Sequence, residues 1–212
     1  RKMVVIENGV DVEKFAPSPE SRRKLRQELG LSLGTKLIGL VARFHPQKDH
    51  RTFIRMARIV RANDPTAEFV LCGEGIDRGN AELMNWINQA DLVGHIHLLG
   101  RRSDLEMVTA ALDVGISSSA SAEGGANTLI EALASGVPCV ATDVGDSKRI
   151  VGSAGFVVAV ADAEAMAQRT LTLLNAGAGR AYGLIARHRA TDHFDIKSVV
   201  RQYEEIYGRA IN

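Results

Sequence analysis

The sequence predicts an α/β domain in which a parallel sheet carries helices on both faces. Short apolar runs alternate along the chain with segments of helical periodicity, and this alternation is typical of strands joined by helical crossovers. The 212 residues, of which 45% are hydrophobic and 24% charged, are enough for one such domain with a sizeable core. The pattern shows no internal repeat and no low-complexity segment.

The elements of the first half follow one another in a regular order. A short apolar run at 3–6 precedes a turn at Asn8 and Gly9, and a charged helix follows at 17–29. The helix expected at 49–63 carries apolar side chains at helical spacing. These side chains are Phe53, Met56, Ala57 and Val60. The remaining elements expected in this half are strands at 36–42, 68–72 and 95–99 and a helix at 80–89.

The second half continues the alternation and ends in helices. A helix at 104–110 precedes a strand at 112–116, which runs out into small polar residues. The next helix ends at Gly136, because glycine commonly follows a helix C-terminus. Strands at 138–141 and 156–158 and three helical stretches complete the chain. The last helix places six apolar side chains on one face, namely Ile196, Val199, Val200, Tyr203, Ile206 and Tyr207.

Ligands of such sheets bind outside the carboxyl ends of the strands. The loops expected to carry function are therefore those that follow the strands. They lie at 43–48, 73–79, 99–103, 117–127 and 142–147.

The most informative loop runs from Glu123 to Glu131. Two carboxylates bracket two glycines, an asparagine expected to cap a helix (Asn127), and an apolar helical start. A glycine-bearing loop before a helix presents unpaired amides to an anion, whereas carboxylates accept hydrogen bonds from hydroxyls. A ligand with both phosphate and hydroxyl groups, such as a nucleotide sugar, suits this combination. The alternative is two solvated glutamates around a tight turn at Gly124 and Gly125.

This stretch resembles the Glu–seven residues–Glu signature of the retaining glycosyltransferases of group 1, which have the GT-B fold. The resemblance continues through 134–145, through 41–48 and through the segment Ile6-Glu-Asn-Gly-Val-Asp11. It implies a Rossmann-like domain that forms the C-terminal, nucleotide-sugar-binding half of a two-domain enzyme. That enzyme would move a sugar from a nucleoside diphosphate sugar to an acceptor and retain the anomeric configuration.

The resemblance also implies roles for individual residues. Glu123 would contact the donor sugar and be important for catalysis, while Glu131 would accept hydrogen bonds from the ribose. Arg43 and Lys48 would neutralise the leaving diphosphate without metal, since arginine and lysine bind phosphate oxygens well. The other donor-binding residues that it implies are Gly73, Gly75, Leu99, Gly100, Gly124, Gly125, Ala126, Asn127, Thr128 and Leu129.

Two departures from the family pattern leave the donor open. Gly125 stands where family members often have an aromatic residue, and Asp146 stands where a second glycine is common. The base and the sugar of the donor are therefore not predicted. No further cofactor is expected beyond the donor substrate.

Three segments are expected. Residues 1–16 would be an interdomain segment, 17–195 the nucleotide-sugar-binding domain, and 196–212 a helix that packs towards an N-terminal domain. Because the chain begins at Arg1 on what resembles a mid-protein hinge, we expect a fragment that is inactive alone. The acceptor, a glycan or lipid-linked glycan, would bind through the other domain.

Other functions receive less support. Gly73 and Gly75 resemble the start of a dinucleotide fingerprint, but Arg78 replaces its third glycine, which disfavours an NAD-dependent oxidoreductase. A non-catalytic nucleotide-binding module remains an alternative. His95 and His97 have no third metal ligand nearby in the sequence and are interpreted as packing residues.

Composition bounds the partners and the compartment. The net charge of +1 gives no reason to expect a nucleic-acid partner, and no apolar run approaches membrane-spanning length. Cys72 and Cys139 lie in apolar strands and are expected to be buried thiols, which suggests the cytoplasm, with peripheral membrane contact through another domain left open. The basic side chains of two helices are expected on solvated faces. They are Arg22, Arg23, Lys24, Arg26, Arg51, Arg55 and Arg58.

Overall fold

A computed structural model describes residues 5–121 and 126–211 of the chain. Its centre is a sheet of six parallel strands in the order β3-β2-β1-β4-β5-β6. This order is that of doubly wound dinucleotide-binding folds, in which the chain reverses direction across the sheet between β1 and β4. The strands are β1 Lys36–Val41, β2 Ala67–Cys72, β3 Ile96–Leu98, β4 Val114–Ser117, β5 Cys139–Thr142 and β6 Gly155–Val158. The predicted parallel sheet is confirmed.

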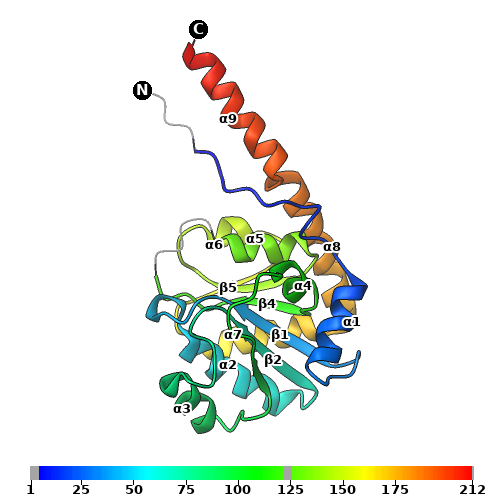
Figure 1. Cartoon of the computed structure of the whole chain (residues 1–212), viewed down its shortest axis with the longest axis vertical. Helices are drawn as coiled ribbons and strands as arrows, with labels where there is room; N and C mark the ends of the chain where they lie inside the picture. Colours follow the sequence, from blue (N-terminus) through cyan, green and yellow to red (C-terminus); the bar gives the residue numbers. More distant parts are fainter. Residues whose placement is uncertain (1–4, 122–125, 212) are drawn as a thin grey trace.

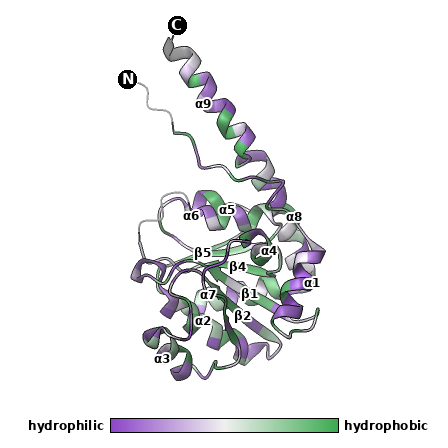
Figure 2. Ribbon diagram, in the orientation of Figure 1, coloured by the Kyte–Doolittle hydropathy of each residue, from purple (hydrophilic) through white to green (hydrophobic). Residues whose placement is uncertain are grey.

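Helices cover both faces of the sheet, as Figure 1 shows. One face carries α1 Pro19–Glu28, α4 Leu105–Ala110, α5 Asn127–Ala134, α6 Ser147–Val151 and α8 Ala176–His193. The other face carries α2 His50–Asn63, α3 Ala81–Gln89 and α7 Ala163–Leu174. Hydrophobic residues concentrate in the strands and on the helix faces that cover them (Figure 2). Cys72 and Cys139 are fully buried within the sheet, as predicted.

Local sequence explains where several elements begin and end. The helix predicted at 17–29 begins at Pro19, because the Ser18 side chain accepts a hydrogen bond from the Ser21 amide at 3.1 Å and proline suits the first helical position. Gly136 adopts φ +70 directly after α5, which confirms the predicted helix end. The helix α6 and the 3-10 turn η1 Pro46–Lys48 were not predicted. Both are too short to show helical periodicity.

The expectation that all four cations of the first helix are solvated is wrong for Arg26. Its side chain is 0% exposed and donates to the carbonyls of Ala111 at 2.7 Å and Thr35 at 3.2 Å, and to Asp113 at 2.9 Å. Arg22 also pairs with Asp113, at 2.8 Å. The sequence pattern does not reveal this because Asp113 lies far along the chain, at the start of β4. Arg23 and Lys24 are exposed as predicted.

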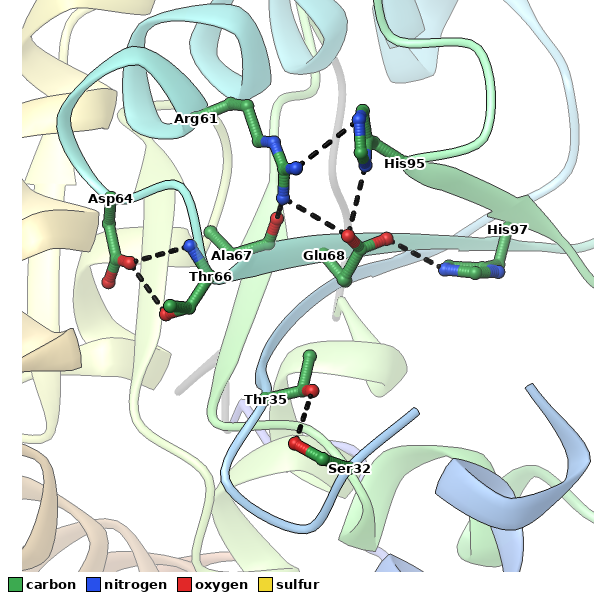
Figure 3. A network of polar contacts seen from close by, with 9 residues as sticks. All are labelled: Ser32, Thr35, Arg61, Asp64, Thr66, Ala67, Glu68, His95 and His97. Atoms are coloured by element: carbon green, nitrogen blue, oxygen red, sulfur yellow. Dashed lines mark hydrogen bonds and ion pairs between the residues drawn. The ribbon is translucent and has the colours of Figure 1, made fainter. Parts of the chain in front are cut away.

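His95 and His97 contact a carboxylate that is distant from them in the sequence. Glu68 of β2 lies 3.0 Å from His95 Nδ1 and 2.9 Å from His97 Nε2, and Arg61 contacts the same carboxylate at 3.1 Å (Figure 3). The arginine supplies the positive charge that this carboxylate needs. Within 5–121 and 126–211, no cluster of three or more ligating side chains is suited to a metal ion.

The N-terminal segment contacts the junction between α8 and the last helix. The Val10 amide donates to the Phe194 carbonyl at 2.8 Å, and the Ile196 amide donates to the Val10 carbonyl at 2.9 Å. From this junction α9 Ile196–Ile211 projects away from the sheet (Figure 1). Within its predicted apolar face only Val199 is buried. The exposed members are Ile196, Val200, Tyr203 and Tyr207.

None of the helices in the described part of the chain combines the length and the apolar character that a membrane crossing requires.

Candidate nucleotide-sugar site

The loops that follow β1, β2 and β3 are hydrogen-bonded to one another at the carboxyl edge of the sheet. The Phe44 amide donates to the Glu74 carbonyl at 2.7 Å, which joins the first loop to the second. The Gly73 amide donates to the Gly100 carbonyl at 2.8 Å, and the Gly100 amide donates to the Ile76 carbonyl at 3.0 Å. The backbone around Gly73, Gly75, Leu99 and Gly100 therefore forms one continuous wall.

Gly73 is required by the close approach of the first two loops. It has φ +153, and a Cβ atom at this position would lie 2.1 Å from the Ala42 carbonyl oxygen. Any other residue would push the end of β1 away from the loop after β2. Gly75, at φ +73, is also in a conformation that favours glycine.

The loop that carries Arg43 and Lys48 is tied to the loop that leads into the signature stretch. Gln47 makes two of these contacts: its carbonyl accepts from the Ala120 amide at 2.8 Å, and its side-chain amide donates to the Ser121 carbonyl at 3.0 Å. The Ser118 hydroxyl donates to the Lys48 carbonyl at 2.8 Å. Lys48 is thus held beside the segment that enters the signature.

Arg43 lies at the end of β1 with an exposed side chain. Its guanidinium makes no ion pair or hydrogen bond with another residue in 5–121 or 126–211. Lys48 ends the turn η1 and is followed by Asp49, which takes a left-handed conformation at φ +44 and caps α2 by accepting from the Thr52 amide at 3.1 Å. The cap fixes the course of the chain directly after Lys48.

Glu123, Gly124 and Gly125 lie outside the described residues. The structure resumes at Ala126, which is buried and immediately precedes α5. The predicted capping role of Asn127 is wrong. Asn127 is the first helical residue, and its Oδ1 accepts from Asn8 Nδ2 at 2.9 Å instead of capping the helix.

This correction matters for ligand binding. Ala126 stands at the capping position and makes no side-chain cap. Within the described residues, the first amides of α5, those of Asn127 and Thr128, therefore have no capping side chain to accept from them. The Leu129 side chain is 2% exposed and its amide already donates to the Ala126 carbonyl at 2.9 Å, so the backbone donors that this helix end can offer to an anion are those of Asn127 and Thr128.

Glu131 lies in α5, one turn beyond these amides. Its Oε2 atom is buried and accepts no hydrogen bond from the described part of the chain. Burial raises the pKa of Glu131 above its ordinary value of 4.5, and the positive charge of Lys14 partly opposes this rise. A buried carboxylate oxygen without a hydrogen-bond donor destabilises the fold. A hydroxyl group of a ligand could supply the missing donor.

Four residues near the candidate site were not predicted from the sequence to belong to it. Asn8 and Lys14 lie in the segment 1–16, which shows no periodicity that would indicate where their side chains lie. Lys14 Nζ is 3.5 Å from Glu106 Oε2 of α4. Gln47 and Ser118 lie in loops that the sequence did select, but only the structure shows that they join those loops.

A Rossmann-like sheet with a helix N-terminus, two cations and a carboxylate near its carboxyl edge, one oxygen of which has no partner among the described residues, is typical of a nucleotide-binding domain. Residues 35–176 match the family described as Glycosyl transferases group 1. The match covers more than half of the chain, which therefore belongs to the group 1 glycosyltransferases.

Individual proteins agree with this assignment. The chain is 27% identical over 97% of its length to a UDP-Gal:alpha-D-GlcNAc-diphosphoundecaprenol alpha-1,3-galactosyltransferase of Escherichia coli, of which it covers 54%. The crystal structure of Anabaena Alr3699/HepE in complex with UDP and glucose is 26% identical, with a TM-score of 0.85 over 97% of this chain and 56% of that one.

A third comparison fixes which half of the GT-B fold is present. The C-terminal domain of the group 1 glycosyltransferase LpcC from Francisella tularensis is 24% identical, with a TM-score of 0.78 over 89% of this chain and 100% of that domain. The fold is thus that of the C-terminal half of GT-B glycosyltransferases. The chain spans about half the length of the Escherichia coli relative.

Proposed function

We propose that the chain is the donor-binding domain of a retaining glycosyltransferase that transfers a sugar from a nucleoside diphosphate sugar to a glycan or lipid-linked glycan. The observation that carries this proposal is the buried Oε2 of Glu131, which has no hydrogen-bond partner among the described residues, next to the start of α5, which has no side-chain cap in the same part of the chain. Phosphate and hydroxyl groups on one ligand would satisfy both features at once.

Each part of the donor then has a counterpart in the chain. The first amides of α5 and the side chains of Arg43 and Lys48 would bind the diphosphate, whose negative charge increases as the sugar leaves. Glu131 would accept hydrogen bonds from the ribose. The base would lie against the backbone of Leu99 and Gly100 and the Gly73–Gly75 loop, and the sugar would lie towards Glu123.

Fixed cations make a divalent metal unnecessary in this proposal. Arginine binds two phosphate oxygens in a fork and lysine acts as a point charge, so Arg43 and Lys48 would perform the neutralisation that a metal performs elsewhere. UDP is the first nucleotide to test, because it is bound in the crystal structures of Anabaena Alr3699/HepE.

The proposal also divides the chain. Residues 1–16 and 196–212 meet at Val10 and Ile196, where the Ile196 amide donates to the Val10 carbonyl, and they would connect the donor domain, 17–195, to an acceptor-binding domain. The exposed apolar face of α9 would contact that domain. The buried thiols of Cys72 and Cys139 fit a reducing compartment, and we propose the cytoplasm as the site of action.

The test is calorimetry with UDP, GDP, ADP and NAD. A nucleoside diphosphate should bind, and NAD should not. Each of Arg43→Ala and Lys48→Ala removes a charge-assisted contact of about 1.5–3 kcal/mol, so each should weaken binding roughly tenfold to a hundredfold. Chelation of divalent metal should leave the affinity unchanged.

Arg51→Ala is the matched control, because Arg51 is an exposed cation on α2, close in sequence to Lys48. Its affinity should equal that of the unaltered chain. Binding that is lost with EDTA yet unchanged in Arg43→Ala would show that the diphosphate site is wrongly assigned.

A further inference from the structure

A second cavity lies at the amino ends of β1 and β4, the edge of the sheet opposite the candidate donor site. Its volume is about 290 Å³. Three elements supply the charged residues that line it: Arg22 comes from α1, Lys36 from the first position of β1, and Arg180 from α8. Asp113, immediately before β4, is the acidic residue in the lining.

The charges around this cavity do not balance. Asp113 already accepts from Arg22 at 2.8 Å, from Arg26 at 2.9 Å and from the Leu37 amide at 2.8 Å. Its single negative charge is therefore shared by two arginines, one of which is completely buried. Burial, and to a lesser extent the neighbouring Arg22, lowers the pKa of Arg26 to about 10, which Asp113 partly opposes.

The other two cations of the lining have no counterion in the described part of the chain. Neither Lys36 nor Arg180 forms an ion pair or a side-chain hydrogen bond with a residue in 5–121 or 126–211. Two arginines thus share the Asp113 carboxylate, while Lys36 and Arg180 line the same cavity. An anion in the cavity would lie between positive charges from three separate elements, a geometry that favours binding over simple surface screening.

The start of α8 adds to the positive potential. Asn175 and Ala176 line the cavity at the N-terminus of this 18-residue helix. The Asn175 side chain caps the Gly177 amide at 3.1 Å, and the remaining amides of the first turn have no helical acceptor. The helix dipole therefore reinforces the side-chain charges on the same side of the cavity.

We propose that this cavity is a second anion site, which binds a compact polyanion of the phosphate or diphosphate class. Its volume lies near the lower end of the range of ligand pockets, about 300–1,000 Å³. No aromatic side chain lines it within the described residues, so it offers no surface on which a nucleotide base would stack. The ligand is thus a small phosphate-bearing ion rather than a nucleotide.

The experiment is titration of inorganic pyrophosphate into a chain whose candidate donor site is disabled by Arg43→Ala and Lys48→Ala. Pyrophosphate should still bind, and Lys36→Ala or Arg180→Ala in this background should weaken binding about tenfold or more, because each removes one charge-assisted contact. Arg23→Ala is the control, since Arg23 is an exposed cation adjacent to Arg22 that does not line the cavity. It should leave the affinity unchanged.

Two further measurements make the result decisive. Thermal unfolding of each variant should show that it folds, and a crystal soaked with pyrophosphate should place the anion between Lys36 and Arg180. Pyrophosphate binding that disappears in Arg43→Ala/Lys48→Ala, or that persists unchanged in Lys36→Ala/Arg180→Ala, would overturn the proposal.

An experiment with lipid vesicles distinguishes a lipid phosphate from a free phosphate ion as the ligand. Sedimentation with phosphatidylglycerol vesicles that depends on Lys36 and Arg180 would identify a lipid phosphate as the ligand. Pyrophosphate binding without such sedimentation would identify a free anion. Binding of neither probe through Lys36 and Arg180 would overturn the site.

Discussion

The surroundings of the Glu131 side chain in the folded chain suggest a role in ligand binding that its position in the sequence does not reveal. The residue lies on a short helix whose other face is buried, and its Oε2 atom accepts no hydrogen bond from the described residues. A structural glutamate in such a place would normally have an arginine, a lysine or backbone amides as a donor. The unsatisfied oxygen therefore indicates a position for a ligand hydroxyl.

The two glutamates of the signature should differ in their kinetic effects. In an enzyme that contains this domain and its acceptor-binding partner, Glu131→Ala should mainly raise the donor KM, because the ribose does not react and is bound equally in ground and transition states. Glu123→Ala should mainly lower kcat, because charge develops at the sugar that it is proposed to contact. Steady-state kinetics with varied donor would measure both.

More donor should therefore rescue Glu131→Ala in part, but not Glu123→Ala. Equal losses of kcat with unchanged donor KM in both variants would show that the residues are not divided between ribose and sugar.

Donor binding should also depend on pH through Glu131. Burial raises the pKa of this carboxyl, so the proton is held more tightly in the folded chain than in the unfolded chain. This group therefore favours folding as the pH falls towards the raised pKa. The ionised carboxylate is the stronger acceptor for a ribose hydroxyl, so nucleoside diphosphate affinity should instead increase as the pH rises through that value.

Calorimetry over a series of pH values that starts at the ordinary carboxyl value and extends above it would measure this dependence. The diphosphate itself titrates in this range, so Glu131→Gln is the control: it keeps the shape of the side chain and removes its charge. The pH dependence of the unaltered chain should be steeper than that of Glu131→Gln. Identical slopes would show that the Glu131 proton is not linked to donor binding.

At the scale of elements, the sequence pattern predicted the six strands of the described sheet and the helices of the described residues, except for α6 and the turn η1. The helix expected at 49–63 was found as α2, because Phe53, Met56 and Val60 form a continuous buried stripe. The helix α6 was missed because five residues make little more than one turn. The role of Asn127 was misjudged for a different reason, since its side chain bonds to Asn8, which is distant in the sequence.

The exposed face of α9 should contribute little to the stability of this chain. Tyr203 is 43% exposed and Tyr207 62%, so Tyr203→Ser and Tyr207→Ser should each change the free energy of unfolding by less than about 0.5 kcal/mol. Val199, at 4% exposure, is the matched contrast on the same helix. Val199→Ser should cost about 1–3 kcal/mol, as measured by urea unfolding of residues 1–212.

If the proposed contact between α9 and an acceptor-binding domain exists, the tyrosine variants should destabilise only a chain that contains both domains. Large losses in residues 1–212 alone would mean that the tyrosines pack within this domain.

At the scale of the whole molecule, the chain corresponds to one lobe of a two-lobed fold. It spans 54% of the Escherichia coli galactosyltransferase and 56% of the Anabaena protein, while it covers all of the C-terminal domain of LpcC. Closure of two lobes around the substrate commonly completes an active site of this kind. This chain alone is therefore expected to bind the donor without transferring its sugar.

Residues 1–212 should bind a nucleoside diphosphate sugar but not transfer its sugar. The measurement uses radiolabelled donor with glycan and membrane-lipid acceptors, and calorimetry on the same preparation confirms that the donor site is intact. Robust turnover by this chain alone would contradict the proposed division of labour.

The sequence by itself determined the parallel α/β fold and the loops of one edge of the sheet, because strand and helix periodicities are local properties of the chain. The signature stretch further indicated the family. The tertiary structure alone decided that Asn8 donates to Asn127, that Glu131 Oε2 is buried without a donor among residues 5–121 and 126–211, and that Arg26 is buried against Asp113. These contacts join residues distant in sequence, and burial and charge pairing depend on packing rather than on local pattern.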